Sequence, residues 1–252
     1  YTWALLTGGV GHTCGVTTTG QAYCWGSNLH GQLGDGTTTH RTIPTLVNGG
    51  HNWASVTGGR SHTCGVTTGG EAYCWGFNRD GNLGDNTVTN RKAPTLISGG
   101  RSWASVTGGN THSCGVTTLS KAYCWGRNSD GHLGDGTTTN RSVPTLVSRG
   151  FTNWVSVDGG EFHSCGVIAG GAAYCWGRNR SGKLGDGTRN QRTIPTLVNG
   201  GHNWASVMGS GGHTCGVTTG GEGYCWGNNG YGARGDGTTT KSSVPIKVGG
   251  NW

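Results

Sequence analysis

The sequence has no long apolar run and is low in charged and aliphatic residues. Charged residues make up 12% and hydrophobic residues 31% of the 252 residues. Such a composition suits neither a helical protein nor a charged, disordered coil. No stretch reaches the roughly 20 apolar residues that cross a bilayer as a helix, so we expect no membrane span.

Methionine is nearly absent, and the N-terminus does not have the charged and apolar regions of a signal peptide. Met208 is the one methionine, and the chain begins at Tyr1. We therefore expect a mature secreted form, a trimmed chain or a segment of something longer.

Acidic residues are also few. The chain has 11 Asp and Glu against 18 Lys and Arg, which gives a formal net charge of +7. The basic residues are scattered, apart from a modest group between Arg178 and Arg192, whereas a nucleic-acid-binding domain usually gathers them on one face. We expect no nucleic-acid partner and interpret the charge as a source of solubility and of weak attraction to acidic partners.

Glycine and tryptophan are abundant, with 54 and 11 residues, and the tryptophans are regularly placed. One tryptophan opens each of five near-identical units with a period of about 50 residues, which indicates a tandem repeat. The predicted repeats are 3–52, 53–102, 103–153, 154–203 and 204–252, within a single domain, 1–252.

Each repeat contains four short strand-like runs separated by glycine-rich turns. The runs read W-A-S-V-T-G-G, H-T-C-G-V-T-T, A-Y-C-W-G and P-T-L-V, and no stretch shows a convincing helical period. Four strands per repeat of this length are typical of a β-propeller blade. The sequence therefore predicts an all-β protein, a β-propeller of five four-stranded blades.

Two cysteines lie ten residues apart in every repeat. With a three-residue turn over 18–20, Cys14 lies opposite Cys24 on paired antiparallel strands, with Cβ atoms roughly 4.5–5.5 Å apart, close enough for a disulfide. The same register predicts one disulfide per blade: Cys14–Cys24, Cys64–Cys74, Cys114–Cys124, Cys165–Cys175 and Cys215–Cys225. The alternative, a metal centre, would need Cys-x-x-Cys spacing or two converging cysteine pairs, and we find neither in the sequence. Disulfides indicate an oxidising compartment, so we expect an extracellular or periplasmic location.

The run "AYCWGSNLHGQLGDGTTTHRTIPTLV" followed by "WASVTGGRSHTCGVTTGG" resembles the repeat of the regulator of chromosome condensation family. The resemblance covers all five units through a G-x-x-H-[TS], Y-x-W-G and N-x-x-G-x-L-G signature from which the fifth unit departs in part, and the cysteine-bearing version is similar to repeat proteins predicted to be exported from bacteria. The resemblance implies a β-propeller of four-stranded blades. The best-known members have seven repeats rather than five. The fifth repeat also departs from the others, with Arg234 at the Leu33 position and Ser242 at the Arg41 position.

Two polar residues recur once per repeat and could form sites. The histidines could hold a metal or an anion in a circle, but we expect turn residues that bond the neighbouring backbone. The aspartates could bind calcium, but one acid per loop gives too few ligands, so we expect Asx-type turns. The histidines are His12, His62, His112, His163 and His213, and the aspartates are Asp35, Asp85, Asp135, Asp186 and Asp236.

Three further features are local. Asn140 and Asn179 each begin an N-R-S glycosylation sequon, which matters only if the source glycosylates exported proteins. "RGDG" at 234–237 contains an adhesion-like tripeptide that we attribute to chance. Trp252 re-enters the repeat in a slot that Trp3 already fills, so we predict that Trp252 makes an assembly contact.

No catalytic set and no cofactor or metal site emerges, because each frequent polar residue is explained first by the repeat. We therefore predict a non-enzymatic extracellular scaffold or binding module, with a protein or glycan partner at the propeller face or edges and with self-assembly as one form of that role. The alternative is a lectin whose aromatic rings stack on sugars. An enzyme inhibitor and a guanine nucleotide exchange factor are weaker alternatives. The rings considered for sugar binding are Phe77, Phe162 and Tyr231.

Overall fold

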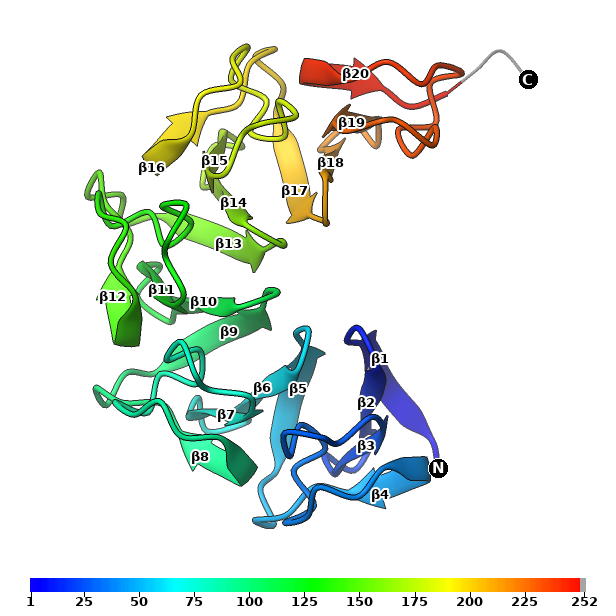
Figure 1. Cartoon of the computed structure of the whole chain (residues 1–252), viewed down its shortest axis with the longest axis vertical. Helices are drawn as coiled ribbons and strands as arrows, with labels where there is room; N and C mark the ends of the chain where they lie inside the picture. The colour runs from blue at the N-terminus through cyan, green and yellow to red at the C-terminus, as the bar shows by residue number, and fades with distance from the viewer. Residues whose placement is uncertain (250–252) are drawn as a thin grey trace. The chain divides into compact units, whose positions relative to one another are not determined.

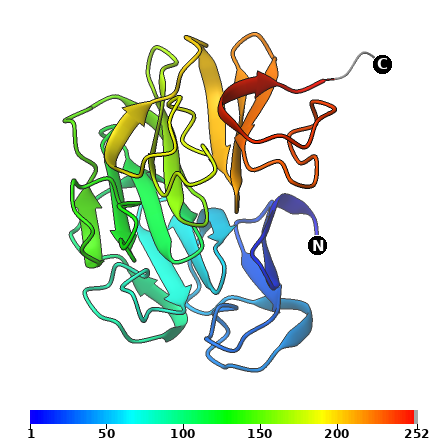
Figure 2. The same cartoon turned by 45° about the horizontal axis from the view of Figure 1, so that its top comes forward.

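The computed structural model describes residues 1–249, which form twenty β-strands in five four-stranded antiparallel sheets without a helix. Each sheet is a meander of consecutive strands with a long loop between its third and fourth strands (Figure 1, Figure 2). This confirms the predicted fold class, an all-β propeller of five four-stranded blades. No helix that could cross a membrane occurs in the described part of the chain.

The blades follow one another along the chain. Blade 1 comprises β1 (Trp3–Gly8), β2 (His12–Thr17), β3 (Ala22–Gly26) and β4 (Arg41–Leu46). Blade 2 comprises β5 (Trp53–Gly58), β6 (His62–Thr67), β7 (Ala72–Gly76) and β8 (Arg91–Leu96). Blade 3 comprises β9 (Trp103–Gly108), β10 (His112–Thr117), β11 (Ala122–Gly126) and β12 (Arg141–Leu146). Blade 4 comprises β13 (Trp154–Gly159), β14 (His163–Ile168), β15 (Ala173–Gly177) and β16 (Arg192–Leu197). Blade 5 comprises β17 (Trp204–Gly209), β18 (His213–Thr218), β19 (Gly223–Gly227) and β20 (Ser242–Lys247).

The chain divides into two compact units. Unit 1 consists of Tyr1–Thr118, Tyr123–Arg127 and Asn140–Thr145, and so holds blades 1 and 2 and most of blade 3. Unit 2 consists of Leu119–Ala122, Asn128–Thr139 and the chain from Leu146 on, and so holds blades 4 and 5 with a loop of blade 3. The single domain that the repeats suggest stays a prediction.

The central hairpin of each blade has the predicted register. In blade 1, Cys14 pairs with Cys24 and Val16 with Ala22, and Gly20 closes the turn at a φ of 81°. This positive φ is the reason for a glycine at the end of a three-residue hairpin turn. A disulfide joins the two cysteines in all five blades, with 4.1 Å between the Cα atoms. One disulfide per blade is therefore confirmed.

Neighbouring blades pack through one repeated contact, here called the interblade joint. One side is the cysteine face of a blade, where Cys14, Val16 and Leu33 are buried in blade 1. The other side is the tryptophan face of the next blade, where Trp53 and Trp75 are buried against them. The same sets meet between blades 2 and 3 and between blades 4 and 5. Each fully buried aliphatic side chain contributes roughly 1.5–3 kcal/mol, so these joints form the core.

The interblade joint also has a polar part. His12 Nε2 lies 2.8 Å from Thr63 Oγ1 of the next blade, and Thr63 Oγ1 donates to Gln32 O at 2.7 Å. Trp75 Nε1 donates to the same carbonyl at 3.0 Å. The equivalent bonds of the His62 and His163 rings reach Ser113 and Thr214. The predicted role of the histidine was therefore wrong, because its ring bonds a hydroxyl of the next blade and not the neighbouring backbone.

The recurring Gly-Gly pair after the first strand reflects how closely neighbouring blades approach. A Cβ atom on Gly59 would lie 2.7 Å from the carbonyl oxygen of Gly109 in blade 3 and 2.5 Å from Cε1 of His62. A Cβ on Gly9 would lie 2.5 Å from the Gly59 carbonyl oxygen. A side chain at Gly9 or Gly59 would therefore push the neighbouring blades apart.

Candidate binding surface

The long loop after the third strand is held by one buried asparagine and one aspartate. Asn28 Nδ2 donates to Asp35 Oδ1 at 3.2 Å and to Thr39 O at 3.0 Å, while Asn28 Oδ1 accepts from Leu33 N at 2.9 Å. Asp35 Oδ1 also accepts from Thr37 N at 3.0 Å, which is the predicted Asx-type turn. The same bonds recur at Asn78 and Asp85.

An arginine completes this network. Arg41 Nε lies 2.7 Å from Asp35 Oδ2, and the Arg91–Asp85 and Arg192–Asp186 pairs repeat it at 2.8 Å. Burial alone would raise the pKa of Asp35, but hydrogen bonds from Thr37, Arg41 and Asn28 lower it below the ordinary value. Both carboxylate oxygens are occupied, and residues 1–249 contain no group of three metal-ligating side chains. The carboxylates of Asp35 and Asp85 thus hold their loops through the same hydrogen bonds.

Blade 5 preserves the ion pair by exchanging two positions. Ser242 replaces the arginine of the other blades, and Arg234 replaces their buried leucine. Arg234 Nη2 lies 2.6 Å from Asp236 Oδ2, so the cation reaches the carboxylate from the other side. Arg234 Nε and Nη1 are buried without a hydrogen-bond partner in residues 1–249. The two departures seen in the sequence thus compensate each other in charge and leave two buried donors unsatisfied.

We expect the double substitution Arg234→Leu with Ser242→Arg to raise the stability of the protein. It restores the arrangement of the other blades and removes the unsatisfied donors, each of which costs about 1–3 kcal/mol when buried. Thermal unfolding should show a higher midpoint for the double variant than for Arg234→Leu alone, in which Asp236 has no cation. A double variant that melts below both the wild type and Arg234→Leu would contradict the compensation.

The repeats differ from one another in their loops, and several of these differences lie at one end of the blades. In an antiparallel meander, the loop between strands 1 and 2 and the loop after strand 3 lie at the same end of the sheet, here called the loop end. At the Val10 position of the first of these loops, the other four blades carry Arg60, Asn110, Glu161 and Gly211. At the Ser27 position of the second, they carry Phe77, Arg127, Arg178 and Asn228. In contrast, the Asn28, Gly31 and Gly34 positions of the second loop carry the same residue in all five blades.

A pocket of about 330 Å³ lies at the loop end of unit 1, and it is here called the loop-end pocket. Its lining combines two arginines, a histidine, an aromatic ring, one carboxylate and three short polar side chains. These residues are His30, Arg60, Ser61, Phe77, Asp80, Asn110, Thr111 and Arg127. Formal positive charge exceeds negative charge there, so the pocket favours an acidic group.

Two polar groups of the loop-end pocket have a long hydrogen bond or no hydrogen-bond partner within residues 1–249. Arg60 is exposed, and its Nη1 donates to Asn110 Oδ1 over a long 3.4 Å. Thr111 Oγ1 is buried with no partner in residues 1–249. The ring of Phe77 meets His30 at 5.1 Å between centroids in an edge contact. Donors without strong partners beside an aromatic ring are suited to a ligand.

In unit 2, the side chains at the corresponding positions contact one another. Arg178 forms a two-pronged pair with Asp130, at 2.9 Å from Nε to Oδ1 and 3.0 Å from Nη2 to Oδ2. Its guanidinium carbon also lies 4.1 Å from the centre of the Phe162 ring. Nearby, Lys183 Nζ donates to Gly211 O at 2.8 Å. Arg178 and Lys183 are therefore both engaged by groups of the protein itself.

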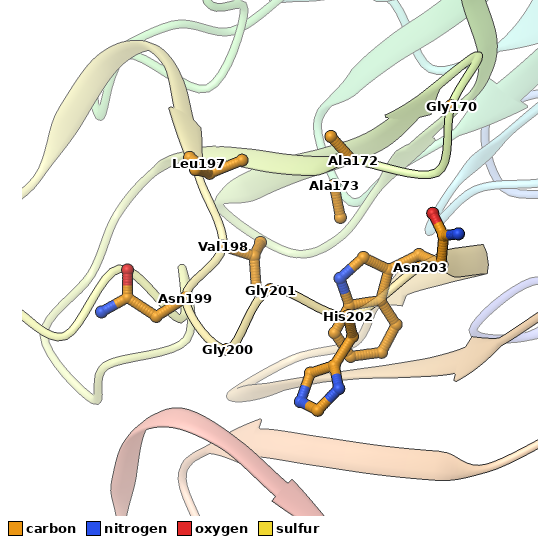
Figure 3. A pocket seen from close by; sticks show the side chains of 11 residues that line it. Gly170, Ala172, Ala173, Leu197, Val198, Asn199, Gly200, Gly201, His202 and Asn203 are labelled. Atoms are coloured by element: carbon orange, nitrogen blue, oxygen red, sulfur yellow. The ribbon is translucent and has the colours of Figure 1, made fainter.

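A second cavity, of about 400 Å³, belongs to the framework of blade 4. Figure 3 shows Val198 and Ala173 on its wall, with His202 and Asn203 from the segment that leads into blade 5. Its lining run 197–204 reads the same as 46–53 in blade 1, and it carries no carboxylate and no arginine or lysine. This cavity therefore follows from the repeat and gives no blade-specific chemistry.

Two of the other predicted site residues reach the loop-end pocket, since Phe77 lines it and Asn140 Nδ2 donates to Asp80 Oδ1 of its lining at 3.3 Å. Asn140 is exposed, whereas Asn179 is 1% exposed and its Nδ2 donates to Asp186 Oδ1 at 3.1 Å. A glycan on Asn179 would break that bond, but both sequons stay predictions. Trp252 lies outside the described residues. Of the three rings considered for sugar binding, Phe77 lines the pocket, Phe162 packs on Arg178, and Tyr231 is exposed.

Sequence reasoning missed Arg60 and Arg127. It treated the repeat as one motif and looked for residues that recur. The available signal was the opposite one, namely the positions where otherwise near-identical blades differ.

Comparison with known proteins places the repeat in a family. The profile described as "Regulator of chromosome condensation (RCC1) repeat" matches residues 19–66, 69–116, 121–167 and 170–217. A second profile of the same description matches 53–82, 103–131 and 154–183. No curated protein matches the chain.

Solved structures share the fold. Human WBSCR16 is similar at a TM-score of 0.86 and 21% identity, covering 96% of this chain and 65% of its own. Prp20p from Saccharomyces cerevisiae, whose structure title reports binding to Gsp1p and histones, is similar at a TM-score of 0.88 and 20% identity, covering 98% of this chain and 63% of its own. The ectodomain of the receptor kinase CR4 from Physcomitrella patens is similar at 0.60 and 26%, covering 89% and 52%.

The chain thus spans less than two thirds of the length of these three proteins. Their fold is a scaffold widely used for protein interactions. Because the repeat profile matches well over half of the residues, the chain belongs to the regulator of chromosome condensation (RCC1) repeat family.

Proposed function

We propose that this protein is a non-enzymatic binding module of an extracellular or periplasmic compartment, and that its loop-end pocket holds an acidic segment of a protein partner. The blade framework supplies a rigid support. The pocket supplies the blade-specific side chains.

The observation that carries this proposal is where the blades differ. The strands, the disulfides and the Asn28–Asp35 type of network are repeated nearly unchanged, because they build the interblade joints and loops. The changes at the Val10 and Ser27 positions alter no core residue, and four of the resulting side chains line one pocket: Arg60, Phe77, Asn110 and Arg127. Side chains that vary on a constant scaffold are where binding specificity is usually found.

The chemistry of the pocket favours a carboxylate next to an apolar stem. A partner's Asp or Glu would accept charge-assisted hydrogen bonds from Arg60 and Arg127, while the Phe77 ring packs against neighbouring carbon atoms. Each charge-assisted bond contributes roughly 1.5–3 kcal/mol. The formal net charge of +7 would add long-range attraction that weakens with salt.

Two observations support the location. Five disulfides are typical of proteins that fold and persist in an oxidising compartment. A receptor-kinase ectodomain is among the similar solved structures.

The experiment uses substitutions borrowed from other blades, so that each new residue is already tolerated at its position. Acidic peptides selected from a displayed random library against the wild-type chain are titrated against Arg60→Asn with Arg127→Ser, the residues of blades 3 and 1. The matched control is Arg101→His with Lys121→Gln, which removes the same charge at the hairpin-turn end of the blades, opposite the loop end, with blade 1 residues. We expect binding about 10- to 100-fold weaker for the pocket variant and unchanged for the control.

Failure to select any acidic peptide, or equal losses in the two variants, would refute the proposed site. The presence of Phe77 in the pocket also suits an acidic sugar. Oligosaccharides of uronic acids are therefore titrated in parallel. Binding of these sugars alone, lost in the Phe77→Ser variant, would replace the protein partner with a glycan.

A further inference from the structure

Blade 4 differs from the other four blades at its hairpin-turn end, the end of the sheet opposite the loop end. Where strand 2 runs into the hairpin turn, the other blades carry two threonines, whereas blade 4 carries Ile168 and Ala169. The second position of strand 1 is alanine in the other blades and Val155 in blade 4. Three positions at one end of one sheet have therefore become larger or purely apolar, in a chain whose repeats are otherwise near-identical.

The change to Ile168 gives up a hydrogen bond of the hairpin. In blade 2, Thr67 Oγ1 accepts from Glu71 N at 3.2 Å, and in blade 5, Thr218 Oγ1 accepts from Glu222 N at 3.1 Å. Ile168 has no hydroxyl and cannot form this bond. Its side chain is also half-buried, whereas the two threonines are buried. A local departure that loses a bond of the repeat and adds accessible apolar surface is more typical of a functional site than of packing.

A cavity of about 370 Å³, here called the hairpin cavity, lies at this end of blades 4 and 5. Its wall combines Val155, Ile168 and Ala169 of blade 4 with Trp204 and Ala205 of blade 5, and all of its lining belongs to unit 2. None of the lining residues is charged. The three changed side chains of blade 4 thus line one uncharged cavity.

The backbone of the cavity wall is largely used by the fold. Trp204 N donates to Gly171 O at 2.8 Å, and Thr219 N donates to Asn203 O at 2.8 Å. The polar side chains of the lining are the Asn203 amide and the Thr219 hydroxyl. A ligand would therefore meet mainly carbon atoms, with two neutral polar groups beside them.

The hairpin cavity adjoins the cavity of Figure 3, because both are lined by Gly170, Asn203 and Trp204. The three side chains that are particular to blade 4 line the hairpin cavity and not the one in Figure 3. The blade-specific chemistry at this end of unit 2 is therefore that of the hairpin cavity.

We propose that the hairpin cavity binds an uncharged small molecule with an apolar body. Cavities of roughly 300–1,000 Å³ with a mainly apolar lining are typical of small-molecule sites. A charged group would lose its water there without gaining a partner of opposite charge, which is costly, so the lining selects against ions. Apolar carbon atoms placed against Val155 and Ile168 would leave water, which is favourable. The proposal does not rest on the function of the loop-end pocket and shares no residue with it.

Fluorescence titration with N-phenylnaphthylamine, an uncharged dye that brightens in apolar surroundings, tests the proposal. The wild type should bind the dye saturably, with one dye per chain. The double variant Ile168→Thr with Ala169→Thr carries the residues of the other four blades and should bind about 10-fold or more weakly. Its thermal midpoint should equal or exceed that of the wild type, because the threonine restores the hairpin hydrogen bond. This second readout separates loss of the site from loss of the fold.

Two single variants complete the set. Val155→Ala, again the residue of the other blades, should weaken dye binding about 3-fold or more, because it removes carbon atoms from the wall. The matched control is Leu119→Thr, which removes an exposed leucine from the hairpin turn of blade 3 and introduces the blade 1 residue. Leu119 does not line the hairpin cavity, so this variant should bind the dye like the wild type.

Displacement of the dye tests the class of ligand. Octanol and octanoate have chains of the same length, and only octanoate is charged, so octanol should displace the dye at a concentration about 10-fold or more lower. Equal displacement by octanoate would contradict an uncharged ligand. Dye binding that does not saturate, or that is the same in the wild type and the double variant, overturns the site. A wild type that dimerises, and that loses both the dimer and the dye in the double variant, would show a protein interface in its place.

Discussion

Reduction of the five disulfides is expected to unfold the protein under otherwise native conditions. Each bridge closes a short loop, with a sequence separation of 10, and contributes roughly 2–3 kcal/mol. Five such contributions are comparable with the whole stability of an ordinary domain, about 5–15 kcal/mol. The sulfurs also lie in the core, because Cys64 and Cys74 are fully buried between blades. Tryptophan fluorescence and near-ultraviolet circular dichroism should both lose their native signals with reductant.

Removal of the Cys64–Cys74 disulfide alone measures how much one bridge contributes to the free energy of unfolding. Cys64→Ala with Cys74→Ala should lower the free energy of unfolding in denaturant titration by at least the roughly 2–3 kcal/mol of its bridge. The control is Thr19→Gly, which installs the blade 2 residue in the exposed hairpin turn of blade 1. This variant should leave the free energy of unfolding nearly unchanged. A fully reduced protein with the same denaturation midpoint as the oxidised one would show that the bridges do not stabilise the blades.

Acid should destabilise the protein well above the pH at which its carboxylates titrate. Burial lowers the pKa of His12 to about 4, and burial together with the charge of His12 lowers the pKa of His62 to about 3. An unfolded histidine has a pKa near 6.5, so the unfolded state binds more protons below that pH. The stability that depends on neutral rings is therefore complete above about pH 6.5 and is lost as the pH falls toward 4 and then 3. At about 1.4 kcal/mol per pKa unit, each ring accounts for roughly 3–5 kcal/mol.

One buried carboxylate, that of Asp158, has the opposite effect on how stability depends on pH. Burial raises the pKa of Asp158 to about 6, because the bond from Gly209 N offsets only part of the desolvation. Its protonation between pH 6 and about 4 favours the folded state. Asp158→Thr, which installs the residue of blades 1 to 3, should therefore be more stable than the wild type at pH 7 and should lose more stability than the wild type between pH 7 and 4.5. Denaturant titrations at pH 7, 5.5 and 4.5 measure both effects, and a wild-type stability that does not change over this range would contradict the buried neutral histidines.

The parts of the fold that depend on one repeat were predictable from the sequence. Alternation along a strand and the length of the hairpin turn place Cys14 opposite Cys24, and the structure shows this register. Four strand-like runs per period likewise predict the blade. Both features need only local geometry and the spacing of residues along the chain.

The contacts between repeats could not be predicted in the same way. The partner of the His12 ring is a hydroxyl 51 residues away, and its identity depends on how one sheet packs on the next. The sequence shows that Arg234 and Ser242 both depart from the repeat, but only the loop conformation shows that they compensate around Asp236. The loop-end pocket combines loops from three blades, so its composition requires the packed structure.

The most direct test of the division between constant framework and variable binding surface is amide hydrogen exchange with and without a selected acidic peptide. The loop-end segments 59–61, 77–81 and 109–111 should become protected, while the hairpin turns at 18–21, 68–71 and 118–121 should exchange as before. Protection confined to the hairpin turns, with no change at the loop-end segments, would show that the partner binds the opposite end of the blades and would contradict the assignment.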